Sequence, residues 1–155
     1  MNELVYRNLS EDAKRQICAW KYGGEYDLYN LPAYEEMQVR QIGFMNPKRG
    51  KNYYGFWDES ILVGFVNILE EKEEVFIGIG VNPDLCNKHY GQRMLLIAYE
   101  ISKKLYPNKP LYLEVRTWNI RAVKCYQKAG FRIDGQAYEL TTGIGTGTFY
   151  RMIKE

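Results

Sequence analysis

Apolar and polar residues alternate along several short stretches of the chain, with the two-residue period of strands that bury one face. These stretches predict strands at residues 4–7, 53–57, 61–69, 74–81, 111–115, 131–140 and 147–153. Elsewhere, apolar residues recur at the spacing of helices that pack one side against a core. Helices are predicted from Ser10 to the glycines at 23–24, near Pro32, across residues 91–106 and between Asn119 and Gly130. The pattern therefore predicts a mixed α/β fold with about six or seven strands and about four helices.

The stretch from residue 111 to 131 holds a strand, a turn, a helix and a helix stop. Asn119 lies where the side chain of a helix N-cap accepts a free backbone N–H. The helix that follows has an apolar stripe, which consists of Ala122, Val123, Tyr126 and Ala129. Gly130 stands where a residue without a Cβ ends a helix in the left-handed conformation. These features alone also fit an ordinary strand–helix–strand unit, in which Tyr126 is a core aromatic.

This stretch resembles motif B of the GNAT superfamily of N-acetyltransferases, in which hydrophobic-Glu-Val, Asn, Ala, Tyr and Gly-Phe follow at the same spacing. Residues 81–92 resemble motif A of that family, where the pyrophosphate of coenzyme A is held. Backbone N–H groups and the positive end of the dipole at a helix N-terminus attract such an anion. The two motifs together imply a single GNAT-like acetyltransferase domain over residues 1–155.

The motif A turn departs from the family's glycine-rich pattern. The aligned residues are Cys86, Asn87, Lys88, His89, Tyr90 and Gly91, so only the last glycine matches. The contacts of such a turn are made by the backbone, and Asn and His are enriched at positive φ. We therefore expect Asn87 and His89 to adopt the turn, and Lys88 to place a cation near the phosphates. The alternative is that this loop has lost tight cofactor binding.

Two glycines, Gly78 and Gly80, lie on one face of the predicted strand at residues 74–81. Glycine inside a strand marks a bulge or a close approach by another backbone or a ligand. A crowded sheet without room for side chains is the alternative explanation. Because a loop and a helix follow the strand directly, we expect a ligand to approach here.

The resemblance implies that an amine attacks the thioester of acetyl-coenzyme A directly, without a covalent enzyme intermediate. Tyr126 occupies the family's position for the acid that protonates the departing thiolate, and a phenol with a pKa of about 10 can donate to sulfur. Glu74 lies near the position where some relatives carry a glutamate base, and a solvent or water-mediated base is the alternative. The cofactor-binding residues implied are Ile79, Val81, Asn87, Lys88, His89, Tyr90, Gly91, Gln92, Asn119, Ala122 and Tyr126.

The acceptor site is expected among the first two predicted helices and the neighbouring strands. Aromatic and acidic residues gather there, namely Tyr22, Tyr26, Tyr29, Tyr34, Glu25, Asp27, Glu35 and Glu36. Rings and carboxylates together suit a cationic amine, through cation–π and charge contacts. The alternative is a solvated surface of helix and loop.

Composition restricts the class of protein further. A length of 155 residues, of which 46% are hydrophobic, indicates one globular domain. The net charge of +2 argues against a nucleic-acid partner. No apolar run reaches the length of a membrane span, and the N-terminus lacks the apolar core of a signal peptide. The three cysteines lack metal-like spacing, which predicts reduced thiols, no metal site and a cytoplasmic location.

The expected function is acetyl transfer from acetyl-coenzyme A to a primary amine of a small molecule or peptide, by a monomer or homodimer. A second hypothesis is a non-catalytic acyl-coenzyme A sensor or partner-binding module, for which the degenerate glycine turn leaves room. A third hypothesis, an RNA- or nucleotide-binding domain, is disfavoured by the weak net charge. Tyr126 favours the enzyme.

Overall fold

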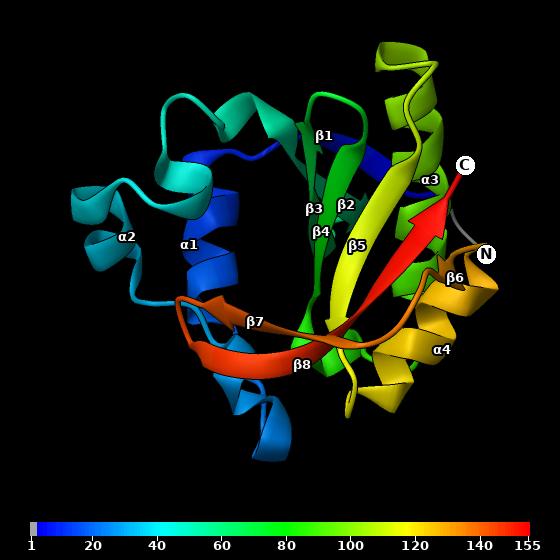
Figure 1. The fold of residues 1–155 in the computed structure, drawn as a ribbon. Helices are drawn as coiled ribbons and strands as arrows, with labels where there is room; N and C mark the ends of the chain where they lie inside the picture. Colours follow the sequence, from blue (N-terminus) through cyan, green and yellow to red (C-terminus); the bar gives the residue numbers. More distant parts are fainter. Residues whose placement is uncertain (1–2) are drawn as a thin grey trace. The chain divides into compact units, whose positions relative to one another are not determined.

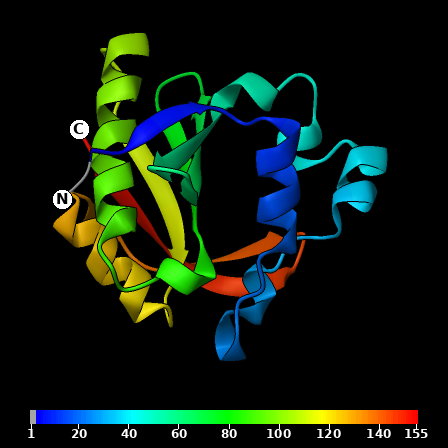
Figure 2. The ribbon, with the colours of Figure 1, turned by 180° about the vertical axis from the view of Figure 1, so that it is seen from behind.

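A computed structural model describes residues 3–155. Figures 1 and 2 show the described helices and strands from two opposite sides. The contacts between residues divide the described chain into two compact units. The first unit consists of the residues up to Asn67 together with Ile79–Tyr90, and the second consists of Ile68–Gly78 together with Gly91–Glu155. Strands β3 (Ile61–Glu70) and β4 (Val75–Val81) each contribute residues to both units. The mixed α/β class predicted from the sequence is confirmed.

The first unit is built on antiparallel strands. β1 (Val5–Asn8) pairs with β2 (Tyr53–Asp58), and β2 pairs with β3. Helical segments fill the chain between β1 and β2, in the order α1 (Glu11–Ala19), η1 (Gly24–Tyr29), α2 (Tyr34–Arg40), η2 (Gly43–Met45) and η3 (Gly50–Asn52). The segments named η are 3₁₀ helices, and a further one, η4 (Pro83–Leu85), follows β4.

An apolar core joins α1 and α2 to strands β2 and β3. Its buried side chains are Ala13, Ile17, Cys18, Met37, Phe44, Trp57 and Leu62. Helix α1 begins as predicted, because the Ser10 side chain accepts a hydrogen bond of 3.1 Å from the backbone N–H of Ala13. The predicted end of this helix is wrong: it stops at Ala19, before the glycines at 23–24, because Trp20 has an extended backbone.

Strand β5 (Leu111–Arg116) lies at the centre of the second unit. β4 and β5 are parallel neighbours, with Val75 beside Leu111 and Phe76 beside Tyr112. This parallel pair, joined by a helix, was the prediction from the sequence, and it is confirmed. The joining helix is α3 (Tyr90–Leu105), whose Met94, Leu95 and Ala98 are fully buried.

The other side of β5 pairs antiparallel with β8 (Gly145–Lys154). Helix α4 (Ile120–Lys128) leads from β5 to β6 (Arg132–Ile133), and both β6 and β7 (Tyr138–Thr142) pair antiparallel with β8. Gly130 has a φ of 97°, as expected for the glycine that ends α4. The order strand, capped helix, glycine and strand is therefore as predicted.

Three details differ from the sequence prediction. Residues 3–155 contain eight strands, because the strand predicted at residues 131–140 is divided into β6 and β7 near Gly135, which has a φ of 81°. The connection before β8 is shorter than the predicted strand ends at 140 and 147 imply, since Thr142 already pairs with Gly145. Val39, an apolar residue near the end of the predicted second helix, is 84% exposed and so does not join a buried face of α2. Within residues 3–155, no helix combines the length and apolar character of a membrane span.

Candidate functional site

The segment between β4 and α3 is fixed to the first unit by Asn82. Its backbone N–H donates to the carbonyl of Val63 at 2.9 Å, and its side-chain amide donates to the carbonyl of Leu62 at 3.1 Å. The side-chain oxygen of Asn82 also accepts a hydrogen bond from the backbone N–H of Asp84 at 3.0 Å. One side chain therefore anchors the start of this loop to β3 and caps η4.

The turn that leads into α3 has the backbone conformation expected from the sequence. Asn87 has a φ of 65° and His89 a φ of 67°, so both residues occupy the left-handed region in the absence of glycine. The side chains of Asn87, Lys88 and His89 are exposed. Because α3 starts at Tyr90, the turn presents the N-terminal end of a long helix together with an exposed ammonium group. This combination suits a phosphate group.

The side chain of Tyr90 has a role that the sequence did not predict. Its hydroxyl donates a hydrogen bond of 2.6 Å to Oδ2 of Asp58, which ends β2. The ring of Tyr90 thus holds the beginning of α3 against the β2–β3 turn. Gly91 follows it and is buried, while Gln92 is half-buried.

The end of β4 is covered by aromatic side chains of the first unit. The ring of Phe65 occupies the space that a Cβ on Gly80 would need, so the ligand explanation for this glycine is wrong and the crowded-sheet explanation holds. The hydroxyl of Tyr22 donates a 2.6 Å hydrogen bond to the carbonyl of Val81. Val81 and Ile79, both predicted to bind cofactor, are half-buried.

In the second unit, β4 and β5 are paired over a short length only. Their register ends at Phe76 and Tyr112, although β5 continues to Arg116 along β8. Beyond that pair, the facing edge of β5 has no backbone partner from β4 within this unit. This stretch of β5, which pairs with β8 along its other edge, contains Glu114 and leads to α4.

Helix α4 positions two of the predicted site residues. The side-chain oxygen of Asn119 accepts a 3.2 Å hydrogen bond from the backbone N–H of Ala122, so the predicted N-cap is confirmed. Asn119 is buried and Ala122 is half-buried. Tyr126, also half-buried, lies nearly two turns along the same helix. The N–H of Ala122 is thus occupied by the cap, and any contact of this residue with a cofactor uses its methyl group or carbonyl.

Glu74 is engaged in an ion pair with Arg151. Nη1 of Arg151 lies 3.1 Å from one carboxylate oxygen of Glu74, and Nη2 binds the other oxygen. The Arg151 side chain also donates to Asp134 at 3.1 Å. Hydrogen bonding to Glu74 is the main reason that the pKa of Arg151 is raised above its ordinary value. Glu74 precedes Val75, at the end of β4 where the strands are still paired.

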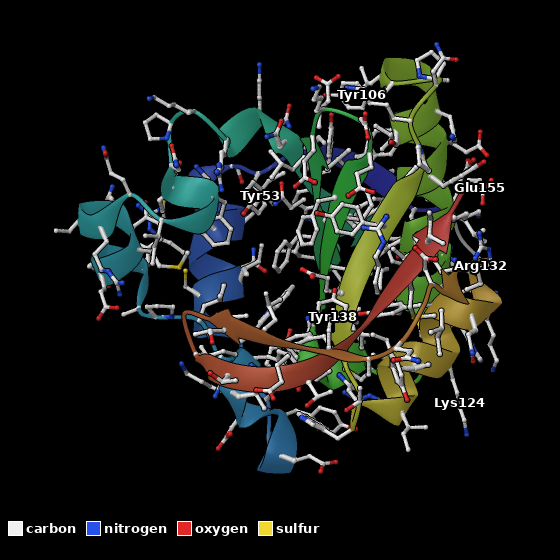
Figure 3. The ribbon with its side chains drawn as sticks, in the orientation of Figure 1. Tyr53, Tyr106, Lys124, Arg132, Tyr138 and Glu155 are labelled. Carbon is white, nitrogen blue, oxygen red and sulfur yellow. The ribbon has the colours of Figure 1, made fainter. Side chains whose placement is uncertain are left out.

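Glu114 is a candidate that the sequence analysis did not single out. Its carboxylate accepts a hydrogen bond from the hydroxyl of Tyr138, which reaches across β8 from β7 (Figure 3). Burial, followed by this hydrogen bond, raises the pKa of Tyr138 well above its usual range, so the phenol remains a donor. The signal was present in the sequence, because the alternation in β5 puts Glu114 on the face opposite to the buried leucines.

The predicted acceptor residues fall into two groups. Tyr26, Tyr29, Glu25 and Asp27 belong to η1, and the loop is closed by a 2.6 Å hydrogen bond from the backbone N–H of Tyr22 to the side chain of Asn30. The second group stabilises helices instead. Tyr34 donates to Glu11 at 2.6 Å, and Glu36 pairs with Arg40 at 3.1 Å along α2, which also carries Glu35.

The described residues contain no cluster of His, Cys, Asp and Glu side chains that could hold a metal ion. Residues 10–131, well over half of the chain, match the acetyltransferase (GNAT) family. The chain belongs to this family. No curated protein sequence matches it significantly.

Solved structures of the GNAT family have the same fold. An acetyltransferase of the GNAT family from Bacillus anthracis superimposes with a TM-score of 0.80 and 17% identity, over 99% of this chain and 95% of that one. A GNAT acetyltransferase from Streptococcus pneumoniae gives a TM-score of 0.69 and 24% identity, over 98% of each chain. The spermidine N-acetyltransferase from Vibrio cholerae, solved with CoA and spermine, gives a TM-score of 0.76 and 18% identity, over 97% of this chain and 94% of that one.

Proposed function

We propose that this GNAT protein transfers an acetyl group from acetyl-coenzyme A to a primary amine in a ternary complex. The observation that carries the proposal is the turn before α3, in which Asn87 and His89 take left-handed conformations without glycine. Asn and His are among the residues other than glycine that adopt this conformation most readily. The turn can therefore present its backbone N–H groups to the pyrophosphate although it lacks the glycines of the family pattern.

The residues of this turn fit coenzyme A. The backbone N–H groups between Asn87 and Gln92 would receive the pyrophosphate, and Lys88 would add a positive charge near it. Ile79 and Val81 would supply backbone groups for the pantetheine arm, and Asn119 would contact that arm while capping α4. In the bound cosubstrate, the thioester supplies the acetyl group and the thiolate leaving group.

Tyr126 is proposed as the general acid. A phenol and a thiol have similar proton affinities, so the Tyr126 hydroxyl can give its proton to the departing sulfur without a strongly perturbed pKa. Its place on α4, in the same helix that Asn119 caps, fits this role. Backbone N–H groups near the end of β4 would polarise the thioester carbonyl.

Glu114 is proposed as the group that receives the proton of the amine. It lies on β5 beyond the last residue paired with β4, and Tyr138 holds its carboxylate in position. Glu74, by contrast, is tied to Arg151 at the other end of β4. We therefore propose that Glu74 stabilises the fold and that Glu114 acts on the acceptor, directly or through water.

A non-catalytic acyl-coenzyme A module is the second candidate, because only Gly91 remains of the family's glycine pattern. The test is a thiol-release assay with acetyl-coenzyme A and a broad panel of amines, together with calorimetric titration of coenzyme A. Turnover of any primary amine supports the enzyme. Binding of coenzyme A without turnover on the whole panel supports the module. A cytoplasmic location and a monomeric or dimeric state stay predictions.

A further inference from the structure

Asn67, near the middle of β3, has a buried side-chain oxygen without a hydrogen-bond partner. Among residues 3–155, the only buried side-chain nitrogen or oxygen atoms in this state are Oδ1 of Asn67 and Oγ of Ser102. A buried acceptor that loses water without gaining a donor destabilises the protein. Each such group in a folded protein therefore needs an explanation, and a ligand that brings the missing donor is one.

Aromatic rings surround this part of β3. Tyr53 on β2 is paired directly with Asn67 in the antiparallel register, and Phe65 lies two residues before Asn67 on the same face. The rings of Tyr53 and Phe65 are 6.4 Å apart at an angle of 32°, and both pack edge-on against the buried ring of Phe44. Tyr53, Phe65 and Asn67 are each only half-buried as whole residues, although Oδ1 of Asn67 itself is covered, so a ligand that binds Oδ1 must displace the atoms that cover it.

The same face reaches the end of β4. The Phe65 ring lies over Gly80, and Trp20 packs near Phe65 with ring centroids 6.4 Å apart. Gly80 is flanked by Ile79 and Val81, the residues proposed to line the pantetheine arm. Tyr53 projects from β2 on the side of α1, where it packs against the apolar core (Figure 3). The amide of Asn67 and the Phe65 ring thus lie on the face of β3 that covers Gly80, which is next along β4 to the residues proposed to hold the pantetheine arm.

We propose that Asn67, Tyr53 and Phe65 form the acceptor subsite, and that its substrate is a small primary amine with one basic nitrogen and an aromatic body. This inference rests on the proposed acetyltransferase function. The Asn67 amide oxygen accepts an N–H of the amine, and the faces of the two rings attract its positive charge and pack against its apolar part. A polyamine is disfavoured, because none of these three residues is a carboxylate that could pair with its further ammonium groups, and burying an unpaired charge is costly.

The test measures 2-phenylethylamine and spermidine as acceptors of the wild-type protein and of Asn67→Leu. Leucine has nearly the shape of asparagine but cannot accept a hydrogen bond. We expect 2-phenylethylamine to have the higher kcat/KM in the wild type. In Asn67→Leu, the KM for 2-phenylethylamine should rise roughly 10- to 100-fold, as for a lost hydrogen bond to a charged donor. The affinity for coenzyme A should not change.

Thermal unfolding separates this role from a structural one. Asn67→Leu should raise the Tm, because it removes an unsatisfied buried oxygen while impairing the acceptor. Ser102→Ala is the matched control: it removes the other unpaired oxygen and should raise the Tm without changing the KM for any amine. If Asn67 were needed only for packing, its replacement by leucine would not raise the Tm and at the same time weaken binding of the acceptor.

Several outcomes would overturn the inference. These are a higher kcat/KM for spermidine than for 2-phenylethylamine, or an unchanged KM for 2-phenylethylamine in Asn67→Leu. If leucine prevents folding, Asn67→Ala gives the same comparison. Absence of coenzyme A binding in calorimetry would refute the proposed function instead. In that case, titration of 2-phenylethylamine into free wild-type protein and Asn67→Leu still tests the subsite, because equal affinities would refute it.

Discussion

The hydroxyl of Tyr90, the first residue of α3, donates a 2.6 Å hydrogen bond to the Asp58 carboxylate at the end of β2. This bond, which ties the start of the helix to the β2–β3 turn, restricts the turn that we propose to bind pyrophosphate. Two side chains from distant parts of the sequence therefore help to fix the backbone at the start of α3.

We expect Tyr90→Phe to weaken coenzyme A binding about threefold to tenfold, because the freed turn must be ordered on binding. Stability should fall by about 1 kcal/mol, the usual contribution of one hydrogen bond. Calorimetry and thermal unfolding measure the two effects. Asp58→Ala should have a similar effect, and the double variant should lose little more. Additive losses of coenzyme A affinity in the double variant would mean that the two residues act independently of this bond.

The left-handed conformation of Asn87 gives a second prediction. A β-branched residue is strained at a φ of 65°, so Asn87→Val should destabilise the protein by roughly 1–2 kcal/mol and weaken coenzyme A binding. Asn87→Gly is the matched control, since glycine takes this conformation without strain and should retain affinity. Equal coenzyme A affinities of the valine and glycine variants would remove this turn from the proposed site.

The sequence predicted local backbone features well, because each depends on a few neighbouring residues. The Ser10 and Asn119 caps, the left-handed Asn87 and the glycine that ends α4 are examples. It failed where distant residues decide the outcome. The Phe65 ring explains why residue 80 is a glycine, but no local sequence pattern connects these positions, which lie on two different strands. The ion pair of Glu74 was likewise hidden, because its partner Arg151 comes from β8.

Glu74→Gln tests whether Glu74 is a base or a structural partner. Because its carboxylate binds Arg151 through two hydrogen bonds, we expect stability to fall by about 1 kcal/mol after allowance for solvent exposure. The value of kcat should remain within about twofold of wild type. Arg151→Gln is the companion variant and should destabilise to a similar extent. A loss of turnover on the order of 10²-fold in Glu74→Gln, with unchanged stability, would restore Glu74 as the base.

Tyr126→Phe separates catalysis from packing, because it keeps the ring and removes the hydroxyl only. If that hydroxyl protonates the thiolate, kcat should fall on the order of 10²–10⁴-fold. Coenzyme A affinity should be nearly unchanged, since the proton moves in the transition state. The measurement needs a poor acceptor, for which the chemical step limits turnover. Wild-type turnover of that acceptor by the Phe variant would leave Tyr126 as a packing residue.

The loss of kcat/KM caused by Glu114→Gln is expected to depend on pH. At neutral pH the acceptor amine is protonated, so loss of the base should lower kcat/KM on the order of 10²-fold or more. As pH approaches the amine's own pKa of about 10, free amine becomes abundant and the deficit should shrink. Glu71→Gln is a matched control, because Glu71 also accepts a tyrosine hydroxyl, that of Tyr112, at 2.8 Å. It should follow the wild-type profile. A deficit in Glu114→Gln that stays constant from pH 7 to about pH 10 would indicate that Glu114 positions the acceptor without taking its proton.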